Sequence, residues 1–134
     1  MSDPTVAGVD LIDLLAREGV ASLTVGGTSV VYSKSVPMPF SDTFGLEYKM
    51  SSPGVIDVKV EIEQGNVLPT TEGASDSNWS VVQTVEASVT TNAVRHKAIA
   101  PVVAKYMRLK LTGQGTNNAS TALAQSRLAF VPQL

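Results

Sequence analysis

The sequence predicts an all-β protein, an antiparallel β-sandwich of jelly-roll or immunoglobulin-like type with roughly seven or eight strands and one short N-terminal helix. Apolar and polar residues alternate with a period of two in one segment after another, which is typical of strands with one face in the core and one in water. Glycine, proline and asparagine separate these segments at regular intervals. The alternation argues against a parallel α/β sheet, whose strands are apolar on both faces.

The size and composition fit one globular domain. The chain has 134 residues, of which 43% are hydrophobic and 16% charged. We therefore predict an N-terminal arm and helix over residues 1–19 and a single sandwich domain over residues 20–134. A net charge of -2 provides no basic surface for nucleic acid or an anionic membrane. The absence of cysteine excludes disulfides, thiolate metal sites and a cysteine nucleophile.

The first segments after the arm of residues 1–9 are "DLIDLLAREG", residues 10–19, and "ASLTV", residues 21–25. Asp10 can cap a helix, Asp13 suits its first turn and Gly19 can end it. Leu11, Leu14 and Leu15 would then share one helix face. The period changes to two at "ASLTV", which predicts the first strand.

Two further strands are expected before the middle of the chain. "TSVVYSKSV", residues 28–36, follows a Gly26–Gly27 turn. The two prolines of "PMPF", residues 37–40, favour a strand edge or a crossover. "FGLEYKM", residues 44–50, alternates cleanly and predicts the next strand.

"VIDVKVEIE", residues 55–63, is the clearest strand of the chain. Ile56, Val58, Val60 and Ile62 are expected in the core, and Asp57, Lys59, Glu61 and Glu63 in water. The polar stretch at residues 64–78 predicts a long loop, which in a compact domain is either functional or an embellishment.

The last third of the chain predicts three strands and one connection. Residues 79–89 form a strand, and residues 90–103 a connection that contains a short strand. "AKYMRLKLT", residues 104–112, places Met107, Leu109 and Leu111 in the core and Tyr106, Arg108 and Lys110 outside. The closing strand at residues 121–131 changes phase, and a bulge near Gln125–Arg127 would reconcile its two halves.

Residues with catalytic potential are few. His96 is the only histidine, and no serine lies in a Gly-x-Ser-x-Gly turn, so we expect a structural or surface role for His96 and no enzyme activity. No glycine-rich phosphate motif precedes a helix. Zinc has too few ligands, and the oxygen donors near the long loop follow no known calcium-loop spacing. Those donors are Glu63, Glu72, Asp76 and Asn78. We predict no catalytic residue, no metal and no cofactor.

Trp79 raises the possibility of a carbohydrate site. It is the single tryptophan and directly follows the long loop, from where it could stack on a sugar. A tryptophan in a sandwich is more often a core residue. A carbohydrate-binding module for host recognition is therefore the alternative function.

Three segments together show a family resemblance: "FGLEYKMSSPGVIDVKVEIEQG", "LPTTEGASDSNW" and "HKAIAPVVAKYMRLKLTGQGTN". Over residues 28–131 the chain resembles small bacteriophage virion proteins of the head decoration, or cement, type. The resemblance implies a β-sandwich on the capsid surface that binds the major capsid protein and braces the shell. It also implies a homo-oligomer, with a homotrimer as the expected form.

This interpretation predicts where the chain contacts its partners. An extended arm can add a strand to a neighbour's sheet edge, and arginine and tryptophan are common anchors of interfaces. The candidate partner-binding residues are Asp10, Leu11, Leu14, Leu15, Trp79 and Arg108. The start of the sequence lacks the basic and apolar regions of a signal peptide, so we expect synthesis in the host cytoplasm. Neither nucleic acid nor a membrane is an expected partner.

Overall fold

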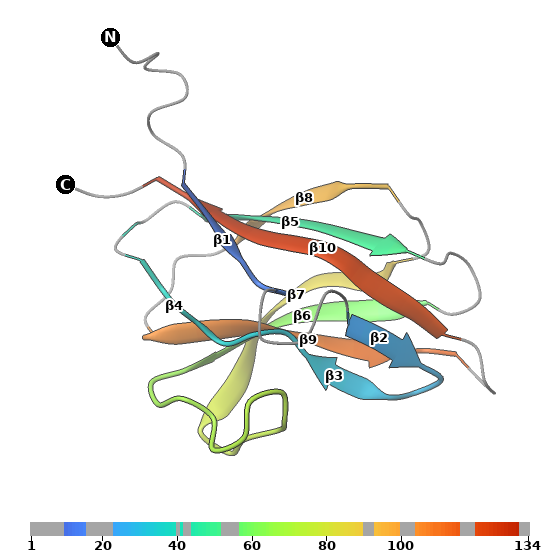
Figure 1. Cartoon of the computed structure of the whole chain (residues 1–134), viewed down its shortest axis with the longest axis horizontal. Helices are drawn as coiled ribbons and strands as arrows, with labels where there is room; N and C mark the ends of the chain where they lie inside the picture. Colours follow the sequence, from blue (N-terminus) through green and yellow to red (C-terminus); the bar gives the residue numbers. More distant parts are fainter. Residues whose placement is uncertain are drawn as a thin grey trace, which may run out of the picture.

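The computed structural model describes residues 10–15, 23–39, 41, 44–51, 57–89, 93–99, 104–115 and 120–131. Every helix or strand within these ranges is a β-strand, ten in all (Figure 1). The strands are β1 (Asp10–Asp13), β2 (Leu23–Gly26), β3 (Val30–Tyr32), β4 (Val36–Pro37), β5 (Phe44–Ser51), β6 (Val58–Gly65), β7 (Trp79–Val89), β8 (Arg95–Ile99), β9 (Tyr106–Gly113) and β10 (Ser120–Phe130).

The strands form two five-stranded antiparallel sheets that pack as a sandwich (Figure 1). The first, here the β10 sheet, has the order β1-β10-β5-β8, and β2 pairs with another stretch of the β10 edge. The second, the β9 sheet, has the order β3-β9-β6-β7, with β4 also on β9. The chain passes from one sheet to the other after β2, β4, β5, β7, β8 and β9, so that 2-10-5-8 of one sheet faces 3-9-6-7 of the other. This order is that of a jelly roll and not that of an immunoglobulin sandwich.

The core lies between the sheets, where the alternation predicted it. Val58, Val60 and Ile62 of β6 are fully buried, as are Met107, Leu109 and Leu111 of β9. The β10 sheet contributes Leu46, Tyr48, Leu123 and Leu128, each at most 1% exposed. Burial of such side chains stabilises a fold by about 1.5–3 kcal/mol each.

Two glycine turns meet at one end of the sandwich. Gly27 has a φ of 55°, in the left-handed region that glycine adopts without strain. A Cβ on Gly113 would lie 2.3 Å from the carbonyl oxygen of Gly27, so only glycine allows this approach. The amide of Gly115 donates to the same oxygen at 3.0 Å. Gly26–Gly27 was predicted as a turn, and these contacts show why glycine is needed there.

The predicted helix over residues 10–19 is wrong for residues 10–15, and the rest of that prediction lies outside the described residues. Residues Asp10–Asp13 form β1, which pairs with Phe130–Arg127 of β10. Asp10 therefore caps no helix and Asp13 lies in no helical turn. The Asp13 Oδ1 accepts a hydrogen bond from the amide of Leu15 at 2.7 Å, where the chain turns after the strand. A helix of this length is marginal alone, and pairing with β10 satisfies the same backbone groups.

Two further differences concern strand limits. The strand expected over residues 28–36 is interrupted at residues 33–35. The amide of Ser33 still donates to the carbonyl oxygen of Leu109 at 3.0 Å, but the Ser33 hydroxyl accepts from the amide of Leu109 at 2.8 Å. The expected edge at the prolines is confirmed, since Pro37 ends the two-residue strand β4. The phase change in β10 is also present. Its register shifts between Leu123 and Gln125, just before the predicted position.

Candidate functional site

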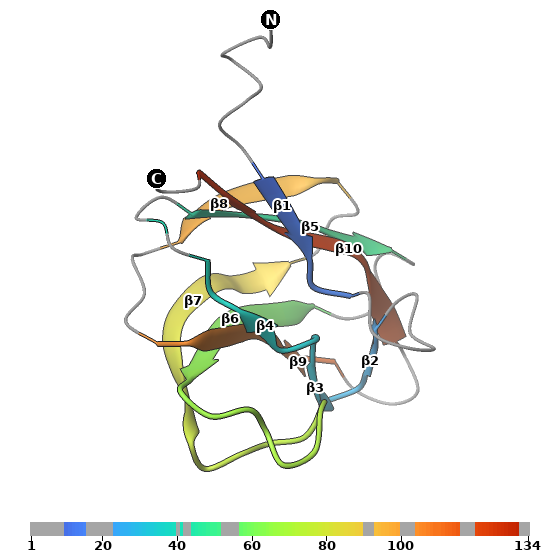
Figure 2. The same cartoon turned by 60° about the vertical axis from the view of Figure 1, so that its left-hand side comes forward.

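The segment 66–78, here the long loop, joins β6 to β7 and lies below the outer face of the β9 sheet (Figure 2). Four side chains gather on this outer face near the loop: Tyr32, Glu63, Trp79 and Arg108, all at most 8% exposed. The prediction that Glu63, Glu61 and Arg108 face water is therefore wrong. Alternation identified the outer face correctly, but it contains no information about a loop that covers that face.

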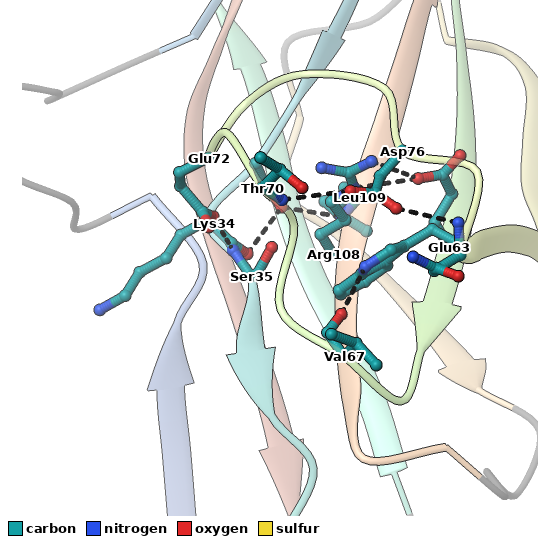
Figure 3. Close-up of polar contacts among 12 residues, drawn as sticks. Lys34, Ser35, Glu63, Val67, Thr70, Glu72, Asp76, Arg108 and Leu109 are labelled. Atoms are coloured by element: carbon teal, nitrogen blue, oxygen red, sulfur yellow. Dashed lines mark hydrogen bonds and ion pairs between the residues drawn. The ribbon is translucent and has the colours of Figure 1, made fainter.

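Arg108 is the centre of this group and has no exposed surface. Its Nε donates to Glu63 Oε1 at 2.9 Å, and its Nη2 lies 2.9 Å from the same oxygen (Figure 3). The guanidinium carbon lies 4.0 Å from the ring centroid of Tyr32 and 4.8 Å from that of Trp79. Charge pairing and cation–π contacts together stabilise the buried cation.

Trp79 fills the space between the long loop and the sheet. Its side chain is 6% exposed, and its indole Nε1 donates to the carbonyl oxygen of Val67 at 2.9 Å (Figure 3). Gly65, opposite Trp79 in the β6–β7 pairing, leaves room for the ring. Trp79 therefore holds the loop and presents no stacking surface to a sugar.

Asp76 organises the loop from within. Its carboxylate accepts hydrogen bonds from the amides of Asn78 at 2.9 Å and Thr70 at 3.1 Å, and its carbonyl accepts from Trp79 at 3.1 Å. The hydrogen bonds from Asn78 and Thr70 lower the pKa of Asp76 below its ordinary value of 3.8. Glu72 attaches the loop to the sheet edge by accepting a hydrogen bond from the amide of Ser35 (Figure 3).

Three of the oxygen donors that the sequence suggested for a cation have protein partners in these contacts. Glu63 pairs with Arg108, Glu72 with Ser35, and Asp76 with two amides. In the described part of the chain, no three acidic or histidine side chains are grouped as metal ligands.

Val67 and Leu68, at the β6 end of the long loop, are 59% and 54% exposed, and Val82 of β7 is 51% exposed. We call these three residues the loop-end patch. Val67 and Val82 line a hollow of about 370 Å³ together with the polar side chains of Gln64, Asn66, Asn78 and Ser80. An apolar group on a loop that hydrogen bonds hold in place is a candidate contact surface.

Ion pairs connect β7 and β8, which are the edge strands of the two sheets. Glu86 of β7 lies 3.0 Å from Arg95 Nε and 3.8 Å from Lys97 Nζ of β8. The hydroxyl of Tyr48 donates to the same carboxylate. Burial and the hydrogen bond to Glu86 raise the pKa of Tyr48 well above its ordinary value of 10.0. His96 projects outward, 73% exposed, with Nε2 3.5 Å from Glu47 Oε2.

The predicted partner-binding residues fall into two groups. Asp10 and Leu11 are exposed on β1, and their role in partner binding stays a prediction. Leu14 and Leu15 belong to the core, and Trp79 and Arg108 lie beneath the long loop. These four are at most 6% exposed and have no free surface for a neighbour in this conformation. The sequence analysis did not identify the loop-end patch, although "NVLP" placed Val67 and Leu68 in a polar loop.

No protein-family model and no curated protein sequence matches the chain. Its fold is similar to that in the structure of infectious bursal disease virus, Gx strain, with a TM-score of 0.55 and 12% sequence identity over 92% of this chain. The Gt strain structure gives a TM-score of 0.51 and 11% identity over 92% of this chain. The chain spans 32% of each of those viral chains. The likeness shows a shared β-sandwich fold. Among the described residues, none forms a helix long and apolar enough to cross a membrane.

Proposed function

We propose that this chain is a bacteriophage virion structural protein, a head decoration protein that binds the major capsid protein on the capsid surface and stabilises the shell. Two independent likenesses support the virion role. The sequence segments resemble phage decoration proteins, and the fold is similar to chains of virus structures over 92% of this chain.

The observation that carries the proposal is the loop-end patch. Leu68 and Val67 are more than half exposed, yet the loop that bears them is attached at several points to the sandwich. A surface that is already ordered loses little conformational entropy when it binds. Its apolar side chains favour a partner with an apolar face of its own, such as a capsid subunit.

Binding of this kind requires no reaction chemistry. The buried Arg108–Glu63 pair, the Trp79 hydrogen bond and the Asp76 bonds all act on the shape of the loop. In the proposed role, they maintain the position of the loop-end patch while the shell exerts force on it. Stabilisation of the shell then follows by mass action, because a ligand that binds only the assembled shell favours the assembled state.

Co-sedimentation with empty shells of the major capsid protein from the same genome tests the proposal. We expect saturable binding that Leu68→Asp weakens about tenfold or more, because the variant places a charge in an apolar contact. Thr71→Asp is the matched control: it adds the same charge to an exposed position of the same loop and should bind normally. Binding that both variants leave unchanged contradicts the assignment of the patch.

The alternative, a carbohydrate-binding module, is favoured by one feature. The hollow beside the loop presents the side chains of Gln64, Asn66, Asn78 and Ser80, which can form hydrogen bonds with sugar hydroxyls. The burial of Trp79 removes the stacking surface that this function would use. A glycan array that gives specific binding, lost on Asn78→Ala, would favour the carbohydrate function over the virion function.

A further inference from the structure

The outer face of the β10 sheet carries a row of apolar residues that crosses four strands. The registers pair Leu11 of β1 with Ala129 of β10, Ala129 with Gly45 of β5, and Gly45 with Ala98 of β8. Directly opposite residues of antiparallel strands point to the same face, so these four form a transverse row. Leu128 of β10 is buried, which places its neighbour Ala129, and the row, on the outside.

The row has a protrusion at one end and a depression at the other. Leu11 is 56% exposed on the edge strand β1. A hollow of about 410 Å³ lies over Gly45, Ala98 and Ala129, and the outward residues Glu47, His96 and Val131 also line it. The hollow follows from the small residues, since a Cβ on Gly45 would meet only the carbonyl oxygen of Lys97, at 3.8 Å.

A second row, beside the first, alternates in charge. The same registers align Asp13 of β1, Arg127 of β10, Glu47 of β5 and His96 of β8. The row is therefore negative at Asp13, positive at Arg127 and negative at Glu47, and it ends at the imidazole of His96. A third, shorter row pairs Gln125 of β10 with Lys49 of β5. Figure 1 shows the four strands β1, β10, β5 and β8 side by side as one layer.

We propose that two copies of the chain associate face to face through this outer surface, about a twofold axis that runs along the strands between β10 and β5. The rotation reverses the order of strands across the interface. Leu11 of each copy then lies over the hollow at Gly45 and Ala98 of the other. Sheets that pack face to face keep their strands within about 30° of one another, which this axis allows.

The charged rows match under the same rotation. Asp13 faces His96 of the second copy, and Arg127 faces Glu47 of the second copy. In the third row, Gln125 faces Lys49 of the second copy. Reversed, the row is complementary to itself, because Arg127 meets Glu47 and the Asp13 carboxylate meets an imidazole that can donate a hydrogen bond. An isologous contact requires this self-complementarity. Charge complementarity at the rim fixes the register and excludes wrong partners.

The twofold pairing differs from the homotrimer that the family resemblance implies. A ring of three needs two different surfaces at each contact, whereas this face complements itself. The pairing does not rest on the proposed virion function. The dimer is measured on the purified full chain without shells. A failure of the dimer proposal therefore leaves the virion proposal unaffected, and the reverse also holds.

Sedimentation velocity over a range of concentrations tests the pairing. We expect a monomer–dimer equilibrium that Leu11→Asp weakens at least about tenfold, since it places a charge in the hollow of the second copy. Val30→Asp, on the edge strand β3 of the other sheet and 44% exposed, should not change it. A monomer at every concentration, a trimer, or a dimer that Leu11→Asp leaves intact would overturn the proposal.

The variants His96→Lys and His96→Glu test the register in opposite directions. His96 is 73% exposed, so both should fold. A fixed positive charge opposite Asp13 of the second copy should tighten the dimer, and a negative charge should loosen it, each by a few-fold. The same response to both variants contradicts the proposed register.

The direction of the axis is tested by cross-linking, because the chain has no cysteine of its own. A chain carrying both Leu11→Cys and Ala98→Cys should form covalent dimers with a short bis-maleimide faster than either single variant. If Leu11→Cys alone reacts as fast as the double variant, then Leu11 faces itself and the axis is wrong.

Discussion

Gly65 leaves the space that the indole of Trp79 occupies: a Cβ on Gly65 would lie 2.7 Å from Trp79 Cε2. We expect Gly65→Ala to lower the free energy of unfolding by about 1–3 kcal/mol, because the buried ring must move. Trp79 is the only tryptophan, so its fluorescence should shift to longer wavelength as the ring is displaced. Urea unfolding followed by fluorescence measures both effects.

Gly45→Ala is the control for that substitution. Its Cβ would meet only the carbonyl oxygen of Lys97, at 3.8 Å, and Gly45 does not have a positive φ. We expect the stability of dilute protein to stay the same or rise by less than about 1 kcal/mol. An equal loss in both variants would mean that the contact with Trp79 is not the cause.

The buried ion pair of Arg108 and Glu63 should be costly to break. Glu63→Gln leaves the guanidinium without its counter-charge, and we expect a loss of about 3–5 kcal/mol in the free energy of unfolding. The pair of Lys59 and Glu61, at 3.4 Å, is the comparison: the Lys59 side chain is 38% exposed, so water screens the pair, and Lys59→Gln should cost less than about 1 kcal/mol. Chemical denaturation measures all of these differences.

A double variant separates loss of the pair from loss of packing. Glu63→Leu combined with Arg108→Met removes both charges and keeps the volume nearly constant, so it should be more stable than Glu63→Gln alone. If it is less stable, the contacts of the guanidinium with Tyr32 and Trp79 outweigh the charge pair.

Tyr48 should make stability fall with pH in the alkaline range. Burial and Glu86 raise its pKa above 10.0, so the folded state holds the phenol proton more tightly than the unfolded chain. The contribution is complete below pH 10 and is lost as the pH rises towards the raised pKa, by up to about 1.4 kcal/mol per pH unit. Tyr48→Phe should reduce this slope. The free energy of unfolding is measured at several alkaline pH values. An equally steep fall with pH in the natural protein and in Tyr48→Phe would contradict this role of Tyr48.

Asp76 should determine the order of the long loop. We expect Asp76→Ala to accelerate hydrogen exchange at the amides of Thr70 and Asn78, which lose their acceptor. In the natural chain, the contribution of the carboxylate is present above pH 3.8 and is lost as the pH falls through the lowered pKa. Ser77→Ala, at an exposed neighbouring position, should leave both amides protected.

The sequence predicted the sandwich because alternation reports directly on the two faces of a strand. Val58, Val60 and Ile62 lie in the core as expected. The same pattern could not reveal that the outer face bearing Glu63 and Arg108 is covered, because the covering segment is a polar loop without periodicity. Only its length indicated a role of its own.

The predicted helix shows a second limit. "DLIDLL" has helix-compatible spacing, yet its first four residues pair with β10, since the sheet edge offers backbone partners that a short helix alone cannot match. The apolar row of Leu11, Ala129, Gly45 and Ala98 joins four distant segments, and its members are assembled by strand order and register. Neither was determined by any local pattern.

Electron cryo-microscopy of shells of the major capsid protein incubated with this chain tests the proposed function most directly. Our account predicts ordered β-sandwich density on the outer surface of the shell, with the loop-end patch, which includes Leu68, against the capsid subunits. Shells that remain bare at saturating protein would contradict the virion role. Sandwich density whose β10 sheet, instead of the long loop, faces the shell would contradict the assigned surface.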